Sequence, residues 1–225
     1  MIDIEYHEVF GFESAIRGMR NPLNSWDKSD SYWDYPEYPD RFVIGPNDLD
    51  LMKRLAKAGS SHRKYLRMIT VYVDITAPLY WWKEFDTYKV GTVANSCSTM
   101  HKIHGKEFLL EDFSTEHLTR GSIDALTHTI ECLNDARDWY LKWDYMQEKD
   151  KVNFDPAIKC KKDLWWQLIQ LLPSSYNQKR TVMLNYEVLA NMYHDRKNHK
   201  LDEWVNFCKW IETLPYSELI TGEEK

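Results

Sequence analysis

An asparagine and an arginine lie eleven residues apart in a largely apolar stretch near the C-terminal end. Asn185, Leu189, Met192 and Arg196 follow one another at intervals of 4, 3 and 4 residues. If the segment 178–196 is one helix, eleven residues at about 100° each return almost to the starting direction. The amide and the guanidinium then share one face, as in the wall of a pocket that binds a planar anionic ligand. An amide that caps a neighbouring strand and an arginine that extends from the core edge explain the same spacing.

Two further pairs of side chains have spacings that occur in metal sites. His101 and His104 form an HxxH pattern, and His128 lies three residues before Glu131 on a predicted helix. Each pair offers two ligands, whereas a zinc site needs three or four from the protein. Because the further ligands are not evident, we interpret these side chains as surface or capping groups and expect no metal.

Local motifs of familiar nucleotide and hydrolase chemistry are missing from the sequence. It contains no GxGxxG, GxxxxGK[ST], GxSxG or HExxH pattern, which excludes simple Rossmann, P-loop, α/β-hydrolase and zincin interpretations. The four cysteines are widely spaced without a CxxC pair, so we predict free thiols. They are Cys97, Cys132, Cys160 and Cys208.

The composition indicates a globular chain that is rich in aromatic residues. Its 225 residues, 43% of them apolar, suffice for one sizeable domain or two small ones. The 10 Trp, 14 Tyr and 8 Phe predict large flat surfaces, either buried or offered to a flat ligand. With 29 Lys and Arg against 35 Asp and Glu, the net charge of −6 argues against an extended nucleic-acid surface. Local charges must therefore meet any anionic ligand.

The elements that position these groups begin with a strand and a long loop. Alternation over Ile2–Tyr6 predicts a half-buried strand, and the charges of this segment argue against a signal peptide. No apolar run approaches the roughly 18 residues of a membrane span, so we expect a cytoplasmic protein without membrane contact. Residues 20–45 hold three prolines among aromatic and acidic residues, which predicts an ordered loop that serves as a lid or an oligomer contact.

A helix, a strand and a second helix follow this loop. The segment 47–58 has Asn47 as its expected N-cap and a stop at Gly59. Residues 66–75 then predict a strand, since Ile69, Val71, Val73 and Ile75 alternate with other residues. The Ala77-Pro78 step ends that strand, and the aromatic segment 80–88 predicts a helix.

Helices dominate the second half of the chain, from about residue 121. One is expected from a Ser122 cap to about Met146, and another from Asp163 to Pro173. A third covers 178–196, and the last carries an apolar face formed by Leu201, Trp204, Val205, Cys208 and Ile211. No repeat or linker interrupts the chain, so residues 1–225 are predicted to be a single domain.

The C-terminal pattern resembles that of the flavin-dependent thymidylate synthases. The signature of that family is similar to a leucine-proline step, an asparagine twelve residues later, an Asn or His six residues on, and an arginine after five more. This chain has Leu172-Pro173, Asn185, Asn191 and Arg196 at those intervals. In the N-terminal half, His62, the strand to Ile75 and Ala77-Pro78 also follow the order of the family. The resemblance spans roughly residues 57–204.

The chain departs from the family where the phosphate-binding arginines of the RHRxxSxNExSxRY motif lie. Aligned without gaps from Ala77-Pro78, the RHR triplet falls on Thr87-Tyr88-Lys89 and the following serine on Thr92. The downstream part falls near 94–100 or, shifted by one residue, on 95–101, where Asn95 and Ser98 match but the glutamate and the arginine of the family do not. Other family positions carry different residues here: two arginines fall on Ile169 and Glu187, and a glutamine falls on Glu84.

The resemblance implies an α/β (α+β) fold with a central, mostly antiparallel sheet flanked by long helices, assembled as a homotetramer with sites between subunits. The family reaction is reductive methylation of dUMP to dTMP: FAD is reduced by NADPH, methylenetetrahydrofolate supplies the methylene group, and no protein nucleophile is required. The implied cofactor-binding residues are His62, Lys89, Thr92, Asn185 and Asn191. The implied substrate-binding residues are Glu84, Ser98 and Arg196.

Three hypotheses about function remain open. The first is a diverged flavin-dependent thymidylate synthase whose phosphates are held by other cations, namely Lys64, Lys89, Lys179 or Arg180. The second is a relative that binds or sequesters a nucleotide-like ligand without thymidylate chemistry, using aromatic rings of segments 80–88 and 26–41 for stacking. The third is an interaction protein whose aromatic residues form subunit contacts. Each lost charge-assisted hydrogen bond is worth roughly 1.5–3 kcal/mol, so several losses would weaken phosphate binding by powers of ten.

Overall fold

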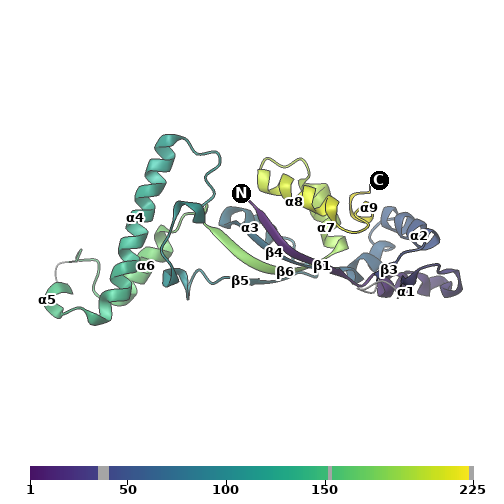
Figure 1. Ribbon diagram of the computed structural model, residues 1–225, viewed down its shortest axis with the longest axis horizontal. Coiled ribbons are helices and arrows are strands. Elements are labelled where there is room, and N and C mark those ends of the chain that lie inside the picture. Colours follow the sequence, from purple (N-terminus) through teal and green to yellow (C-terminus); the bar gives the residue numbers. More distant parts are fainter. Residues whose placement is uncertain (35–40, 152–153, 223–225) are drawn as a thin grey trace. The chain divides into compact units, whose positions relative to one another are not determined.

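The structure, a computed structural model, describes residues 1–34, 41–151 and 154–222 (Figure 1). It has a mixed α/β fold with an antiparallel sheet. The chain divides into two compact units. We call residues 2–75, 84–95 and 180–225 the sheet unit, and Met1 with residues 76–83 and 96–179 the helical unit. The single-domain organisation stays a prediction.

A four-stranded sheet has the order β1-β4-β6-β5. Its strands are β1 (Asp3–Phe10), β4 (Thr70–Pro78), β6 (Asn177–Asn185) and β5 (Val93–Ser96). The predicted alternation before Ala77-Pro78 is confirmed, because Ile69, Val71, Val73 and Ile75 are all at most 1% exposed. In β1 the predicted alternation fails at Tyr6, which has a φ of 50° and is 78% exposed.

The segment before Asn185 is a strand, so the prediction of one helix over 178–196 was wrong. Gln178, Val182 and Leu184 are buried at even positions, which is the period of a strand. The helix α7 covers only Tyr186–Arg196, and Asn185 is its N-cap. The series Asn185, Leu189, Met192 and Arg196 therefore starts at the N-cap, outside the helix.

Helices complete the sheet unit. They include α1 (Phe12–Arg20), α2 (Pro46–Lys57), α7, α8 (Asp202–Thr213) and α9 (Glu218–Thr221). The predicted apolar face of α8 is confirmed for Trp204, Cys208 and Ile211, which are buried together with Phe207. Helix α3 (Leu79–Phe85) matches most of the predicted 80–88 helix.

The rings of α3 are core side chains rather than a stacking platform. Trp81 and Trp82 are 0% exposed, and Phe85 is 2% exposed. The indole nitrogen of Trp82 donates a hydrogen bond to the carbonyl of Gln178 at 2.9 Å. Since these rings have no free face, the hypothesis that they stack on a ligand is wrong for all three. Tyr88, at the end of the segment, is half-buried.

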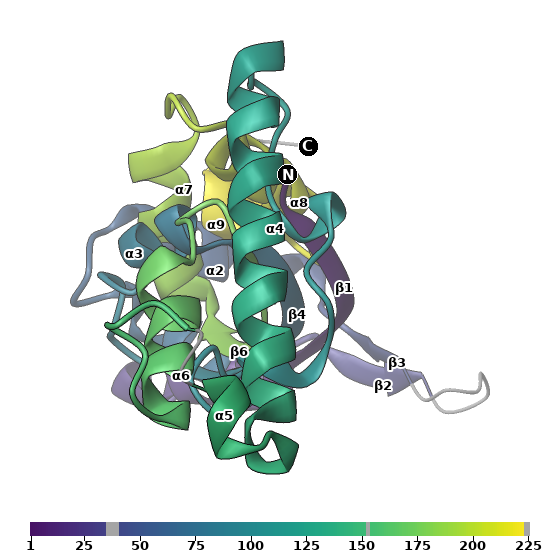
Figure 2. The same ribbon diagram turned by 90° about the vertical axis from the view of Figure 1, so that its left-hand side faces the viewer.

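The helical unit is built on α4 (Arg120–Lys142) and α6 (Lys161–Leu171), which pack side by side (Figure 2). The cap of α4 is Thr119 rather than Ser122, because the Thr119 hydroxyl accepts the amide of Ser122. The short α5 (Glu148–Lys151) follows α4. Buried residues of this unit form one apolar cluster: Ile103, Phe108, Phe113, Leu126, Ile130, Leu133, Ala136 and Leu168.

Among the described residues there is neither a candidate membrane span nor a candidate metal-binding group. None of their helices is long and apolar enough to cross a membrane. No three of their His, Cys, Asp or Glu side chains are grouped so that they could hold a metal ion. All four cysteines carry free thiols, as predicted.

The segment 20–45 contains two short strands, which the loop prediction missed. The strands β2 (Tyr32–Asp34) and β3 (Arg41–Val43) pair antiparallel, with Trp33 opposite Phe42. Each strand has only three residues, so an alternation of apolar and polar residues does not show in the sequence. Residues 35–40, which carry part of the predicted acidic-aromatic loop, lie outside the described residues.

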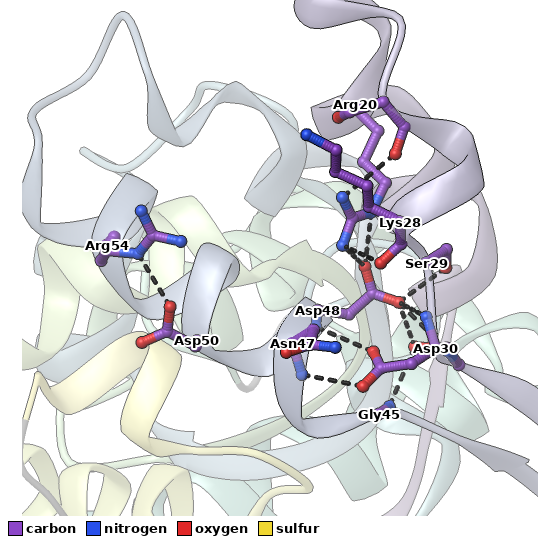
Figure 3. Close-up of polar contacts among 11 residues, drawn as sticks. Arg20, Lys28, Ser29, Asp30, Gly45, Asn47, Asp48, Asp50 and Arg54 are labelled. Carbon is purple, nitrogen blue, oxygen red and sulfur yellow. Dashed lines mark hydrogen bonds and ion pairs between the residues drawn. The ribbon is translucent and has the colours of Figure 1, made fainter.

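A buried carboxylate organises this segment (Figure 3). Asp48, 0% exposed, accepts hydrogen bonds from Arg20 Nε and from the hydroxyls of Ser29 and Ser31, each at 2.6 Å. It also accepts the amides of Asp30 and Ser31 at 3.2 Å. Burial would raise the pKa of Asp48, but the hydrogen bonds from Ser29, Ser31 and Arg20 outweigh burial and hold the pKa below its usual value.

The cap of α2 comes from this loop and not from Asn47. The N-cap position is Gly45, and the Asp30 carboxylate accepts the amides of Asn47 and Asp48 at 2.9 and 3.0 Å. A Cβ on Gly45 would lie 2.2 Å from the Asp30 side chain. A sequence-based cap assignment misses this contact because the capping carboxylate is fifteen or more residues away.

We expect Asp48→Asn to lower the free energy of unfolding by about 3–5 kcal/mol, because it leaves the buried Arg20 guanidinium uncompensated. Urea denaturation measures this. The matched control is Asp50→Asn, which breaks an exposed Asp–Arg pair on the same helix and should cost less than about 0.5 kcal/mol. Equal effects of the two variants would contradict the assignment.

The same pair of proteins tests the pH dependence. A carboxylate whose pKa is lowered by folding stabilises the protein above its unfolded pKa of about 4, and this contribution is lost as the pH falls through the folded pKa. The stability difference between the wild type and Asp48→Asn should therefore be constant from pH 5 to 7 and narrow below about pH 4. A difference that does not narrow would count against a charged Asp48.

Candidate functional site

Arg196, at the end of α7, lies between two aromatic rings and a carboxylate. Its Nε donates a hydrogen bond to the Tyr88 hydroxyl at 3.0 Å, and its Nη1 lies 3.1 Å from Glu84 Oε2. The guanidinium carbon is 5.7 Å from the ring centroid of Tyr88 and 5.1 Å from that of Trp204. The structure thus brings together two predicted substrate-binding residues, Arg196 and Glu84, while their role stays a prediction.

The Glu84 carboxylate is shared among several partners. Its Oε2 accepts the indole N–H of Trp204 at 2.8 Å and lies 3.6 Å from His199 Nε2. The Tyr88 hydroxyl in turn donates to Asp195 at 3.1 Å. Burial raises the pKa of Tyr88, and Asp195 raises it further, while Arg196 opposes them. We call this set the Arg196 cluster. Its arginine is paired with the Glu84 carboxylate, which belongs to the same sheet unit.

A second set of charges surrounds Glu187 in the first turn of α7. Glu187 is 6% exposed, and its carboxylate forms ion pairs with Arg67 and, at 3.4 Å, with Arg63 Nε. Arg63 also donates to the side-chain oxygen of Asn191 at 3.0 Å. Two guanidiniums therefore meet one carboxylate, so this Glu187 cluster keeps one positive charge in excess.

A cavity of about 380 Å³ adjoins the Glu187 cluster. Three cations and a histidine line it, together with Glu218 and apolar groups. The lining residues are Lys53, Ala56, Lys57, Arg63, Leu66, Ala190, His194, Glu218, Leu219, Ile220, Thr221 and Gly222. The volume lies within the range of small-molecule sites. Two predicted cofactor-binding residues flank the lining in sequence, since His62 precedes Arg63 and Asn191 follows Ala190.

The predicted cofactor-binding residue Asn185 has internal partners. Its side-chain oxygen accepts the amide of Val188 at 2.9 Å, and its amide donates to the carbonyl of Gly91 at 3.2 Å. Gly91 has a φ of 72°, and a Cβ there would lie 2.5 Å from the Asn185 amide nitrogen. Thr92 also turns inward, donating to the Tyr88 carbonyl at 2.9 Å. Both contacts hold the loop after α3, on which Lys89 is exposed.

The remaining candidates are divided between the two units. Ser98 belongs to the helical unit, where its hydroxyl accepts the amides of Met100 and His101 at 3.2 and 2.9 Å. Lys179 belongs to the same unit. Arg180 pairs with Asp86 at 2.8 Å. Lys64 and His62 are exposed beside Arg63.

The sequence interpretation missed all three cations that line the cavity. Lys53 and Lys57 lie four residues apart on α2, and Arg63 begins the short 3-10 helix that follows. A spacing of four places side chains on one helical face, so this signal was present. Glu84 and Glu187, which stand where the family has a glutamine and an arginine, are each paired with arginine.

Comparisons with known proteins bear on the fold. No family model and no curated protein matches this sequence. Among solved structures, thymidylate synthase X from Helicobacter pylori with FAD and dUMP is 14% identical, with a TM-score of 0.65 over 99% of this chain and 98% of that one. A second structure, of the flavin-dependent thymidylate synthase from Helicobacter pylori complexed with FAD and dUMP, is 15% identical, with a TM-score of 0.64 over 100% and 99% of the two chains.

A third solved structure with the same likeness is a UMP/dUMP methylase, PolB from Streptomyces cacaoi, bound with 5-Br dUMP. It is 12% identical, with a TM-score of 0.59 over 99% of this chain and 95% of that one. At such identities the likeness shows the fold. The chain therefore has the fold of these proteins over nearly its whole length, while the homotetramer stays a prediction.

We expect Asn185→Ala to lower the free energy of unfolding by about 1–2 kcal/mol, because it removes the cap of α7 and the contact to Gly91. The control is Asn198→Ala, which changes an exposed amide just after the same helix and should alter stability by less than about 0.5 kcal/mol. Chemical denaturation compares the two. A neutral Asn185→Ala would show that the amide is not structural.

Proposed function

We propose that this chain binds a nucleotide-like, phosphate-bearing ligand in the cavity between α2, α7 and α9 of the sheet unit. The observation that carries the proposal is the charge of the cavity wall, where Lys53, Lys57 and Arg63 meet one carboxylate, Glu218. Solved structures of the same fold contain FAD and dUMP or 5-Br dUMP, which supports a nucleotide over other anions.

The balance of charge favours an anion. Lys53 Nζ lies 3.6 Å from Glu218 Oε1, so one cation of the wall is compensated. Lys57 remains, and the Glu187 cluster, to which Arg63 belongs, adds its one excess positive charge. In a protein of net charge −6, such a local excess is what an anionic ligand requires.

The apolar part of the wall supports a ligand with a hydrophobic moiety. Leu66, Ala190 and Ile220 line the cavity beside the cations. Inorganic phosphate would leave this apolar surface uncovered, whereas the base and sugar of a nucleotide would bury it.

The donor set also fits FAD, whose pyrophosphate is anionic. Arg63 lines the cavity, and its buried Nε, 3.4 Å from the Glu187 carboxylate, forms no hydrogen bond within the described residues. With FAD as the ligand, Arg63, Lys57 and Asn191 would hold it. When bound, FAD supplies the redox and one-carbon chemistry of the family reaction, for which NADPH and methylenetetrahydrofolate are the further reactants.

A nucleotide-binding protein without thymidylate synthesis is the second candidate. It is favoured by the Arg196 cluster, where the predicted substrate arginine is already paired with Glu84 at 3.1 Å. A substrate phosphate would have to displace that carboxylate. Reductive methylation of dUMP by the purified protein, with FAD and NADPH, distinguishes the two candidates. Formation of dTMP would exclude the second one.

The binding proposal predicts that Arg63→Ala weakens nucleotide affinity about 10- to 150-fold, the equivalent of one charge-assisted hydrogen bond of about 1.5–3 kcal/mol. Isothermal titration with FAD, dUMP and UMP measures this. Arg54→Ala is the matched control, because Arg54 lies on α2 outside the cavity wall and pairs with Asp50. It should leave the affinity unchanged. No binding of any of the three ligands would refute the proposal.

The flavin part has its own test. Purified protein that retains FAD should be yellow and absorb near 450 nm, and dialysed protein should regain the colour when FAD is added. A colourless preparation that takes up no FAD would remove the flavin from the proposal. The titration with dUMP and UMP would then decide on nucleotide binding alone.

A further inference from the structure

A second cavity with aromatic and basic walls lies in the helical unit. It has a volume of about 450 Å³ and is lined by Tyr140, Lys161, Lys162 and Trp165. Tyr140 comes from α4 and the others from the first turns of α6, which packs beside α4 (Figure 2). Neither the predicted site residues nor the proposed function involves this cavity.

The rings of this cavity are fixed by neighbouring groups. The indole N–H of Trp165 donates to the carbonyl of Met100 at 3.0 Å, and the Trp165 ring contacts that of Trp166 with centroids 4.8 Å apart. The Tyr140 ring lies 4.7 Å from that of His104. Rings that are held in place lose little entropy when a ligand binds against them.

Positive charge gathers around the same rings. Lys161 Nζ lies 4.8 Å from the centroid of Tyr140. Burial lowers the pKa of His104, and the nearby charges of Lys102, Lys161 and Arg137 lower it further. The Nδ1 atom of His104 is buried and has no hydrogen-bond partner among the described residues.

The nearby carboxylates are already engaged. Asp144 accepts a hydrogen bond from Lys161, and Asp138 pairs with Arg137 at 2.9 Å. Asp163 accepts the amides that precede α6. Among the ion pairs of the described residues, none includes Lys102 or Lys162. These two cations are therefore available to an anion.

We propose that this cavity binds a nucleoside phosphate, with the base against the rings of Tyr140 and Trp165 and the phosphate at Lys161 and Lys162. A ligand without a ring would leave the aromatic walls unused, and a ring without an anion would leave Lys162 unpaired, since Asp144 already pairs with Lys161. Stacking on aromatic rings between lysines is how proteins hold nucleotides without reading their sequence. A free nucleotide and one residue of a single strand share this chemistry.

Photocrosslinking of the full chain tests the site. The probes are 5-iodouridine monophosphate and a single-stranded decanucleotide that carries one 5-iodouridine. We expect mass spectrometry to find the crosslink on a peptide that contains Tyr140 or Trp165. Crosslinking by the mononucleotide alone supports a free nucleotide as the ligand, and crosslinking by the decanucleotide supports a strand. If neither probe labels these peptides, the proposal is overturned.

Charge reversal provides the second measurement. The double variant Lys161→Glu, Lys162→Glu should weaken binding of the crosslinking probe at least tenfold by fluorescence anisotropy. The control is Lys149→Glu, an exposed lysine of α5 outside the cavity wall, which should leave binding unchanged. The variant Trp165→Phe retains a ring at this position, so it should still crosslink at Tyr140 or at position 165. Equal affinity of the double variant and the wild type would overturn the proposal.

Failure of this site is distinguishable from failure of the proposed function. Arg63→Ala lies in the sheet unit and should not change the crosslink to Tyr140 or Trp165. Crosslinks confined to peptides with Arg63 or His194 would overturn the inference about the helical unit. They would at the same time support the cavity of the sheet unit.

Discussion

The change from strand to helix at Asn185 is the constraint on which both charged clusters depend. One side chain ends β6, caps α7 through the amide of Val188 and holds the carbonyl of Gly91. Helix α7 then carries Glu187 at its first turn and Arg196 at its last, while the loop with Gly91 keeps Tyr88 near Arg196. Because the two clusters share this helix, a shift of its start would displace both sets of ion pairs.

Elements whose apolar residues follow one clear period could be predicted from the sequence, whereas segments whose apolar residues fit two periods could not. The buried alternation of Ile69 to Ile75 and the apolar face of α8 follow directly from spacing. Leu184 instead belongs to a strand and Leu189 to a helix, and the two elements join without a turn residue. The sequence of this segment therefore fits both the period of a strand and that of a helix. The cap of α2 by Asp30 and the pairing of Glu187 with Arg67 depend on contacts between distant segments, which local patterns do not contain.

Packing explains a part of the aromatic content. Trp81, Trp82 and Trp204 are fully buried, and their size lets short helices cover a small sheet. Some rings also meet cations, and Trp204 belongs to both groups. Trp204 lies against Arg196 in the sheet unit, and Tyr140 lies against Lys161 in the helical unit. Composition alone does not separate these two uses of aromatic residues, since both consist of flat side chains beside other groups.

The two arginine clusters differ in charge, and this difference decides where an anion would go. In the Arg196 cluster the guanidinium is matched by Glu84, so a phosphate gains little there unless the carboxylate moves. In the Glu187 cluster the carboxylate is shared by Arg63 and Arg67, and a cavity lined by further lysines adjoins it. Glu187 therefore does not repel a ligand from this wall. By pairing with Arg63, it positions a cation at the wall of this cavity.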